Sequence, residues 1–108
     1  MEKNIQSGKQ LSAKTQLSTT PLFPLGALVA TPGALDLLDR NGANATVYLS
    51  RHQHGDFGTL CPDDAQENMT AIKYRFRVIS AYDVGTERLW VITEADRSST
   101  TLLLPSEY

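Results

Sequence analysis

The sequence predicts an α+β protein, with a short N-terminal strand, three helices and then a three-stranded antiparallel β-meander packed on the helices. Two patterns predict this class. Apolar residues recur at helical spacing between residues 32 and 76, and they alternate along the strand-like segments that follow. The chain has 108 residues, of which 41% are apolar and 20% charged. Such a chain can bury a core without a disulfide or a structural metal.

Residues 1–20 are predicted to form a flexible tail, and residues 21–108 a single α+β domain. The first twenty residues are rich in Ser, Thr, Gln and Lys and contain no aromatic residue. They bury too little apolar surface to offset the entropy lost on ordering. The domain then begins with an apolar run over residues 25–30, LGALVA, which predicts a short buried strand.

Two capped helices are predicted next. Thr31 suits the N-cap of the first helix and Pro32 its first position, and residues 41–42 (Asn-Gly) favour its end. Asn44 caps a second helix that continues to about Gln53. The side chains expected to face the core are Ala34, Leu35, Leu37 and Leu38 in the first helix and Ala45, Tyr48, Leu49 and His52 in the second.

The third helix is predicted to open at residues 61–64, Cys-Pro-Asp-Asp. Proline suits the first turn of a helix, and carboxylates there interact favourably with the helix dipole. Apolar residues follow at spacings of four, three and four, which predicts one buried stripe. The members of this stripe are Ala65, Met69, Ile72 and Phe76.

The antiparallel meander is predicted from alternating segments. Residues 76–82 and 88–94 are expected to form two strands joined by a hairpin loop over 83–87. A polar connector over 95–99 leads to a third strand over 100–104. In the first of these strands, one face is expected to carry Phe76, Val78, Ser80 and Tyr82.

Charge divides unevenly along the chain. Residues 1–20 carry three Lys/Arg against one Asp/Glu, a net charge of +2, whereas residues 21–108 carry seven against eleven, a net charge of −4. An acidic body disfavours direct nucleic-acid binding, which depends on cations that neutralise phosphates. No apolar run approaches the roughly 20 residues of a membrane span, and the N-terminus resembles no signal peptide. We therefore expect a cytoplasmic protein with no membrane partner.

A cluster of two imidazoles and one carboxylate is the most chemical-looking feature of the sequence. His52, His54 and Asp56 are weak candidates for zinc or another transition metal, because these groups are common metal ligands. The structural alternative is favoured: His52 packs in the core, and His54 with Asp56 caps the C-terminal end of the second helix. The prediction is no metal, no cofactor and no assembled catalytic set.

The loops that flank the middle strand of the meander concentrate hydroxyl and carboxylate groups beside the most apolar strands. Polar density against a rigid sheet is typical of a binding edge, although the same residues also cap tight turns. The candidate contact residues for a protein partner are Asp83, Glu87, Glu94, Asp96, Arg97, Ser98, Ser99 and Thr100. An exposed strand edge would also allow a homodimer.

Five stretches of the chain carry a resemblance: LGALVATPGALDLLDR (25–40), RHQHGDFGTL (51–60), DDAQEN (63–68), SAY (80–82) and LWVITEADRSSTTLLLPSEY (89–108). In these stretches the chain resembles a family of small proteins carried on plasmids and integrative mobile elements of proteobacteria. Many members have tryptophan at the position of Phe57. The resemblance implies a protein borne by mobile DNA that acts on host defence, plasmid maintenance or DNA transfer, and it supplies no catalytic residues.

The first hypothesis is a non-catalytic accessory protein that binds a macromolecule and inhibits a host-defence complex of the restriction or CRISPR type. An acidic surface can compete for a basic nucleic-acid channel. The first alternative is a ribosome-dependent RNase-like toxin, and the second is a small metal-dependent hydrolase. The toxin would cleave RNA with Arg75, Arg77, Arg88 and His54. The hydrolase would use His52, His54, Asp56 and Asp96.

Overall fold

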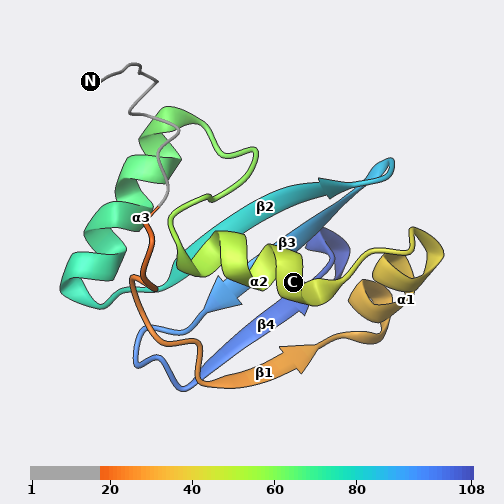
Figure 1. Ribbon diagram of the computed structural model, residues 1–108, viewed down its shortest axis with the longest axis horizontal. Coiled ribbons are helices and arrows are strands. Elements are labelled where there is room, and N and C mark those ends of the chain that lie inside the picture. The colour runs from red at the N-terminus through yellow and green to blue at the C-terminus, as the bar shows by residue number, and fades with distance from the viewer. Residues whose placement is uncertain (1–17) are drawn as a thin grey trace, which may run out of the picture.

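The computed structural model describes residues 18–108, in which three α-helices lie against one four-stranded sheet (Figure 1). The predicted α+β class with three helices is confirmed. The predicted flexible tail lies outside the described residues up to residue 17. In chain order the elements are β1 (Ala27–Ala30), α1 (Pro32–Arg40), α2 (Ala45–Gln53), α3 (Pro62–Tyr74), β2 (Val78–Val84), β3 (Glu87–Thr93), β4 (Ser99–Leu103) and the short 3-10 helix η2 (Pro105–Glu107).

The sheet is mixed, and this corrects the predicted meander. Its strand order is β1-β4-β3-β2, in which β2, β3 and β4 pair antiparallel as expected. The N-terminal strand does not stand apart, because β1 pairs in parallel with β4, from Ala27 opposite Ser99 to Ala30 opposite Leu102. The prediction that this strand is buried is wrong, since its first three residues are exposed at the edge of the sheet. A parallel partner requires a long crossover, and here the three helices and the β2–β3 hairpin supply it. A local sequence pattern can predict that a segment forms a strand, but it does not predict which strand it pairs with.

The hairpin between β2 and β3 is tighter than the predicted five-residue loop. The strands pair as far as Val84 opposite Glu87, so that only Gly85 and Thr86 form the turn. Gly85 has a φ of 62°, in the left-handed region that favours glycine. A Cβ at Gly85 would also lie 2.4 Å from the side-chain oxygen of Asn41. The left-handed backbone therefore favours glycine here, and a larger residue would also displace the Asn41 side chain.

One face of the sheet is covered by α1 and α2, and α2 runs across this face in Figure 1. We call it the covered face. Of the four residues predicted to share this face, Val78, Ser80 and Tyr82 are each at most 1% exposed, whereas Phe76 precedes β2 and is 59% exposed. Of the predicted helical core, Leu35 is the clear exception at 57% exposure. The buried residues of the main cluster are Ala34, Leu37, Leu38, Leu49, Tyr82, Val84, Leu89, Val91 and Leu102.

The buried side of α3 differs from the predicted stripe. Met69 is 44% exposed and Phe76, which follows the helix, is 59% exposed, whereas Asn68 and Ala71 are buried. The reason is a polar contact with the sheet: Asn68 Nδ2 donates to the carbonyl of Ile79 at 2.7 Å, and its Oδ1 accepts from the Ile79 N–H at 3.1 Å. The predicted stripe is thus confirmed in part, because Ala65 and Ile72 are half-buried against the core, whereas Met69 and Phe76 are not part of the buried side.

The β2 edge of the sheet is closed by backbone as well as by Asn68. The N–H of Ala81 donates to the carbonyl of Phe57 at 3.1 Å, and the N–H of Thr59 donates to the carbonyl of Ala81 at 2.7 Å. Between them Gly58 has a φ of 78°, and a Cβ there would lie 1.9 Å from the Ala81 oxygen. This loop protects the edge strand from pairing with another chain.

Candidate functional site

The predicted contact residues at the β2–β3 hairpin form local ion pairs. Asp83 pairs with Arg88 across the two strands at 3.1 Å, and Glu87 pairs with Arg40 of α1 at 2.9 Å. All four side chains are between 43% and 61% exposed, so water screens these pairs. The hairpin residues remain available at the surface, with their charges compensated.

The predicted residues of the 94–99 connector lie at the opposite end of β3, about 20 Å away for a strand of this length. Glu94 contacts Arg77 at 3.4 Å. The carboxylate of Asp96 accepts from the N–H of Ser98 at 2.9 Å, and hydrogen bonds from Ser98 lower the pKa of Asp96. Ser99 begins β4 and is half-buried. The structure thus divides the eight predicted residues between two ends of the sheet.

Arg97 is buried and holds the connector together from inside. Its guanidinium donates to the carbonyls of Phe76 at 2.6 Å and Glu94 at 3.1 Å through Nη1, and of Ala71 at 3.0 Å through Nη2. Its central carbon lies 5.5 Å from the ring centre of Phe23. Arg97 forms no ion pair with a carboxylate of the described residues. Arg97 is only 6% exposed, so the prediction that it is a surface contact residue is wrong.

His52 is fully buried and belongs to a hydrogen-bonded chain that joins α2 to three strands. Its Nδ1 lies 2.6 Å from Ser80 Oγ, and its Nε2 lies 2.9 Å from Thr93 Oγ1. Thr93 Oγ1 lies 2.7 Å from the hydroxyl of Thr100, which donates to the carbonyl of Leu25 at 2.7 Å. Because Thr100 donates onward, Thr93 must donate to Thr100 and accept from Nε2–H of His52. Thr100 is therefore also excluded as a surface contact, at 0% exposure.

The metal candidates do not converge. Both ring nitrogens of His52 are occupied, and burial together with the charge of Arg97 lowers the pKa of His52 to about 3. His54 Nδ1 lies 2.7 Å from the carbonyl of Ser50, and Asp56 pairs with Arg51 at 2.6 Å. Nowhere in residues 18–108 do three His, Cys, Asp or Glu side chains gather as they would around a metal ion.

The arginines proposed for an RNA-cleaving site are also separated. Arg77 pairs with Glu94 near one end of the β2–β3 hairpin, and Arg88 pairs with Asp83 near the other. Arg75 ends α3 with a φ of 62°. Among the described residues, these arginines do not form the basic groove that an RNA substrate would require.

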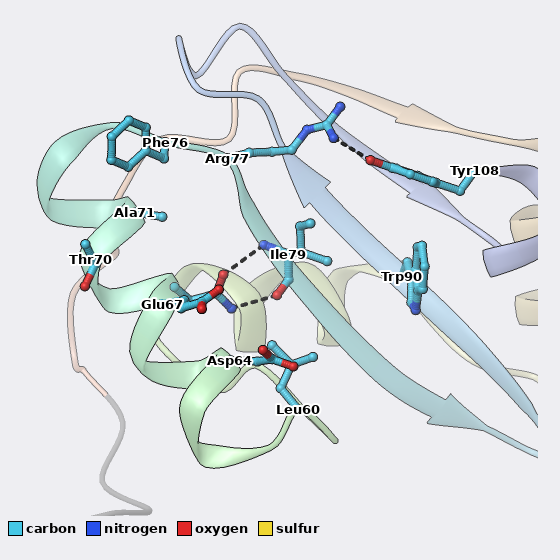
Figure 2. A pocket seen from close by; sticks show the side chains of 11 residues that line it. Leu60, Asp64, Glu67, Thr70, Ala71, Phe76, Arg77, Ile79, Trp90 and Tyr108 are labelled. Carbon is cyan, nitrogen blue, oxygen red and sulfur yellow. Dashed lines mark hydrogen bonds between the residues drawn. The ribbon is translucent and has the colours of Figure 1, made fainter.

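The feature that sequence reasoning missed is a groove on the second face of the sheet. It has a volume of about 630 Å³ and lies between α3 and the last residue, as Figure 2 shows. Ile79 of β2 and Trp90 of β3, both half-buried, line it from the sheet. The α3 side contributes Asp64, Glu67, Asn68, Thr70 and Ala71, and the remaining lining residues are Leu60, Phe76, Arg77 and Tyr108. We call this feature the α3 groove.

The far wall of the α3 groove is held by contacts distant in sequence. The ring of Tyr108 packs edge-on against that of Trp90, with centroids 5.5 Å apart, and its hydroxyl accepts from Nη1 of Arg77 at 2.6 Å. Glu107 anchors this segment, since its carboxylate accepts from the Thr31 hydroxyl at 2.6 Å and from the N–H of Gly33 at 3.1 Å. These bonds lower the pKa of Glu107.

The near wall of the α3 groove is acidic. Asp64 and Glu67 are exposed, and neither forms an ion pair with another described residue. The one cation on the lining, Arg77, is already engaged by Glu94 and Tyr108. The groove therefore combines an aromatic and aliphatic surface with two carboxylates that no cation of the described residues compensates. The spacing of Asp64 and Glu67 on one helix face was visible in the sequence, but their aromatic counterpart, 23 or more residues later, was not.

Comparisons of the chain with protein-family models, with curated proteins and with solved structures find no match. None of the helices in residues 18–108 is both long and apolar enough to cross a bilayer.

Proposed function

We propose that this protein works by binding another macromolecule, without catalysis, through the α3 groove. The proposal rests on one observation: a single groove combines two α3 carboxylates, which form no ion pair within residues 18–108, with the apolar rings of Trp90 and Tyr108. Aromatic side chains that are only partly covered are typical anchors of protein interfaces. A partner that fits this groove carries an apolar side chain flanked by lysine or arginine.

Charge supports a partner that itself handles nucleic acid. The described residues carry seven Lys/Arg against eleven Asp/Glu, and four of the seven cations pair with carboxylates in the same fold. Arg97 is a fifth cation withdrawn from the surface. An acidic surface attracts a basic one at long range and competes there with phosphates.

The proposed biological role is that of an accessory protein of a mobile genetic element, which inhibits a host-defence complex of the anti-restriction or anti-CRISPR type. The resemblance in residues 89–108 and the acidic groove both support this role. The basic, apolar segment would then belong to the nucleic-acid channel of a host nuclease. Occupying that channel blocks DNA entry without any chemistry in the inhibitor.

The test is inhibition of DNA cleavage by a purified restriction complex and by a purified CRISPR effector complex. We expect the protein to bind one of them and to protect DNA, and we expect Asp64→Lys/Glu67→Lys to lose this protection at least tenfold. The matched control, Asp36→Lys/Asp39→Lys, makes the same charge change on α1 and should retain protection. Equal loss in both variants would show that overall charge acts rather than the groove. Failure to bind and to protect DNA in both systems would overturn the proposed role.

A further inference from the structure

The two edge strands of the sheet, β2 and β1, differ in how far other residues cover them. The β2 edge is covered by the loop at Gly58 and by Asn68. The β1 edge has no such cover among residues 18–108, since none of the loop, cap or side-chain hydrogen bonds reaches Leu28 or Ala30. Leu28 is 57% exposed and Val29 is 48% exposed.

The backbone groups of β1 that point outward can be assigned from its pairing with β4. Ala27 donates to the carbonyl of Ser98 at 3.0 Å, and Thr31 donates to that of Leu102 at 3.0 Å. Backbone direction alternates along a strand, so Leu28 and Ala30 direct their N–H and C=O groups away from the sheet. Two donors and two acceptors therefore lie along an edge that no other residue of 18–108 covers, spaced as a strand presents them.

We propose that a second copy of this chain pairs with β1 through this edge, antiparallel and about a twofold axis, so that the two sheets become one. With that axis at Val29, Leu28 lies opposite Ala30 of the other copy, and the four outward groups of each strand bond to those of its partner. Val29 then faces its own equivalent as a close, non-hydrogen-bonded pair. One strand thus supplies both halves of a complementary contact, as a twofold interface requires.

The absence of charge at this edge favours a second copy of the chain over a basic strand, which is the kind of partner that the acidic groove attracts. The run from residue 25 to residue 35 contains no charged side chain, so two copies meet here without opposing like charges. An uncharged edge attracts a basic partner no more than a neutral one. Natural edge strands are commonly guarded by lysine or by an internal proline, and neither lies within residues 27–30. A contact built on four residues is small, so we expect a dimer that forms with rising concentration.

The first test uses a cysteine as a register marker. Cys61 is the single cysteine of the chain and is exposed, so it is replaced by serine. In that background, Val29→Cys places two thiols opposite each other at the twofold axis, at a separation that a disulfide can span. We expect oxidation to give a disulfide-linked dimer from Val29→Cys and at least tenfold less from Val47→Cys, an equally exposed valine on α2.

The second test removes only an outward donor. Ala30→Pro eliminates the outward N–H of Ala30 and leaves the bonds between β1 and β4 intact. Sedimentation from micromolar to millimolar concentration should show a monomer–dimer equilibrium for the wild type and a monomer for Ala30→Pro, with circular dichroism confirming that the variant is folded. If Ala30→Pro unfolds, Val29→Lys replaces it, with Val47→Lys as its control. A wild-type monomer at every concentration, or equal cross-linking at positions 29 and 47, would overturn the proposal.

Discussion

The two faces of the sheet use their side chains in opposite ways. On the covered face, even the polar side chains are buried and hydrogen-bond to one another. They are His52, Ser80, Thr93 and Thr100, each at 0% exposure. On the second face, Trp90 remains half-buried beside a groove whose acidic wall lacks a cation among the described residues. The covered face is therefore the source of stability, and the second face is free to be the source of binding. Substitutions on the two faces should separate these properties.

The largest effect is expected just beyond the covered face, at Arg97. Arg97→Met removes the donor to the Phe76 carbonyl and leaves it without a hydrogen bond from the described residues, and it removes one donor from the Ala71 carbonyl, which still accepts from the N–H groups of Phe76 and Arg75. We expect the free energy of unfolding to fall by about 4 kcal/mol, measured by urea denaturation. Arg75→Met, at an exposed arginine with the same left-handed backbone, should change it by less than about 0.5 kcal/mol. Similar losses in both variants would contradict the role assigned to the Arg97 guanidinium.

The next largest effect is a dependence of the free energy of unfolding on pH, which arises from His52 on the covered face. Burial lowers the pKa of His52 to about 3, against about 6.5 in an unfolded chain. Below pH 6.5 the unfolded state binds a proton that the folded state does not, so stability falls as the pH is lowered towards about 3. The slope contributed by His52 is up to about 1.4 kcal/mol per pH unit, or about 3 kcal/mol between pH 6.5 and pH 4.

Two variants assign this slope to one histidine. Urea denaturation over the same pH range should show the slope reduced by that amount in His52→Leu and unchanged in His54→Leu, which replaces the only other histidine. Leucine cannot take up a proton, so the slopes can be compared over the pH range in which His52→Leu still shows a cooperative unfolding transition. A slope that persists in His52→Leu would show that the carboxylates alone set the acid response.

On the second face, losses of stability should be small and losses of binding large. Tyr108→Ala removes an edge-on contact with Trp90 and a hydrogen bond with Arg77 at a side chain that is 67% exposed. We expect a loss of about 1 kcal/mol in thermal or urea unfolding, together with a loss of protection against the proposed nuclease partner. Tyr74→Ala, at a 60% exposed tyrosine outside the α3 groove, should preserve both properties.

The smallest effect on stability is expected at the acidic wall. Glu67→Lys alters an exposed carboxylate with no ion pair among the described residues, so unfolding should shift by less than about 0.5 kcal/mol. Binding of the proposed partner should still weaken, because the substitution places a cation where the partner's cation would sit. A variant that unfolds would show that Glu67 serves the fold instead of the groove.

Much of the fold was predictable because its cues are local. Thr31 caps α1 by accepting from the N–H of Ala34 at 3.2 Å, and Asn44 caps α2 by accepting from that of Thr46 at 2.9 Å, as their positions in the sequence indicate. The contacts of α3 were not predictable in this way. Asn68 faces the sheet and binds the backbone of β2. A hydrophobic pattern cannot predict that a polar side chain will pair with a strand edge.

The candidate site was less predictable than the fold, because polar residues are ambiguous in sequence. Arg97 and Thr100 sit in a run of hydroxyl and charged groups typical of a surface, yet tertiary contacts draw both inside. The α3 groove requires the last residue to return to the middle of the sheet. That return depends on Glu107 reaching the start of α1, 74 to 76 residues earlier in the chain.

Trp90 is the only tryptophan in the chain, and its indole lies at the groove rather than under the helices. The molecule consequently carries its own optical probe at the proposed contact. A ligand that enters the groove changes the solvent around the indole and shifts its emission, with no dye attached. A second copy added at β1, two strands away in the sheet, leaves that emission unchanged. Fluorescence can therefore tell the two proposed contacts apart in a single unlabelled sample.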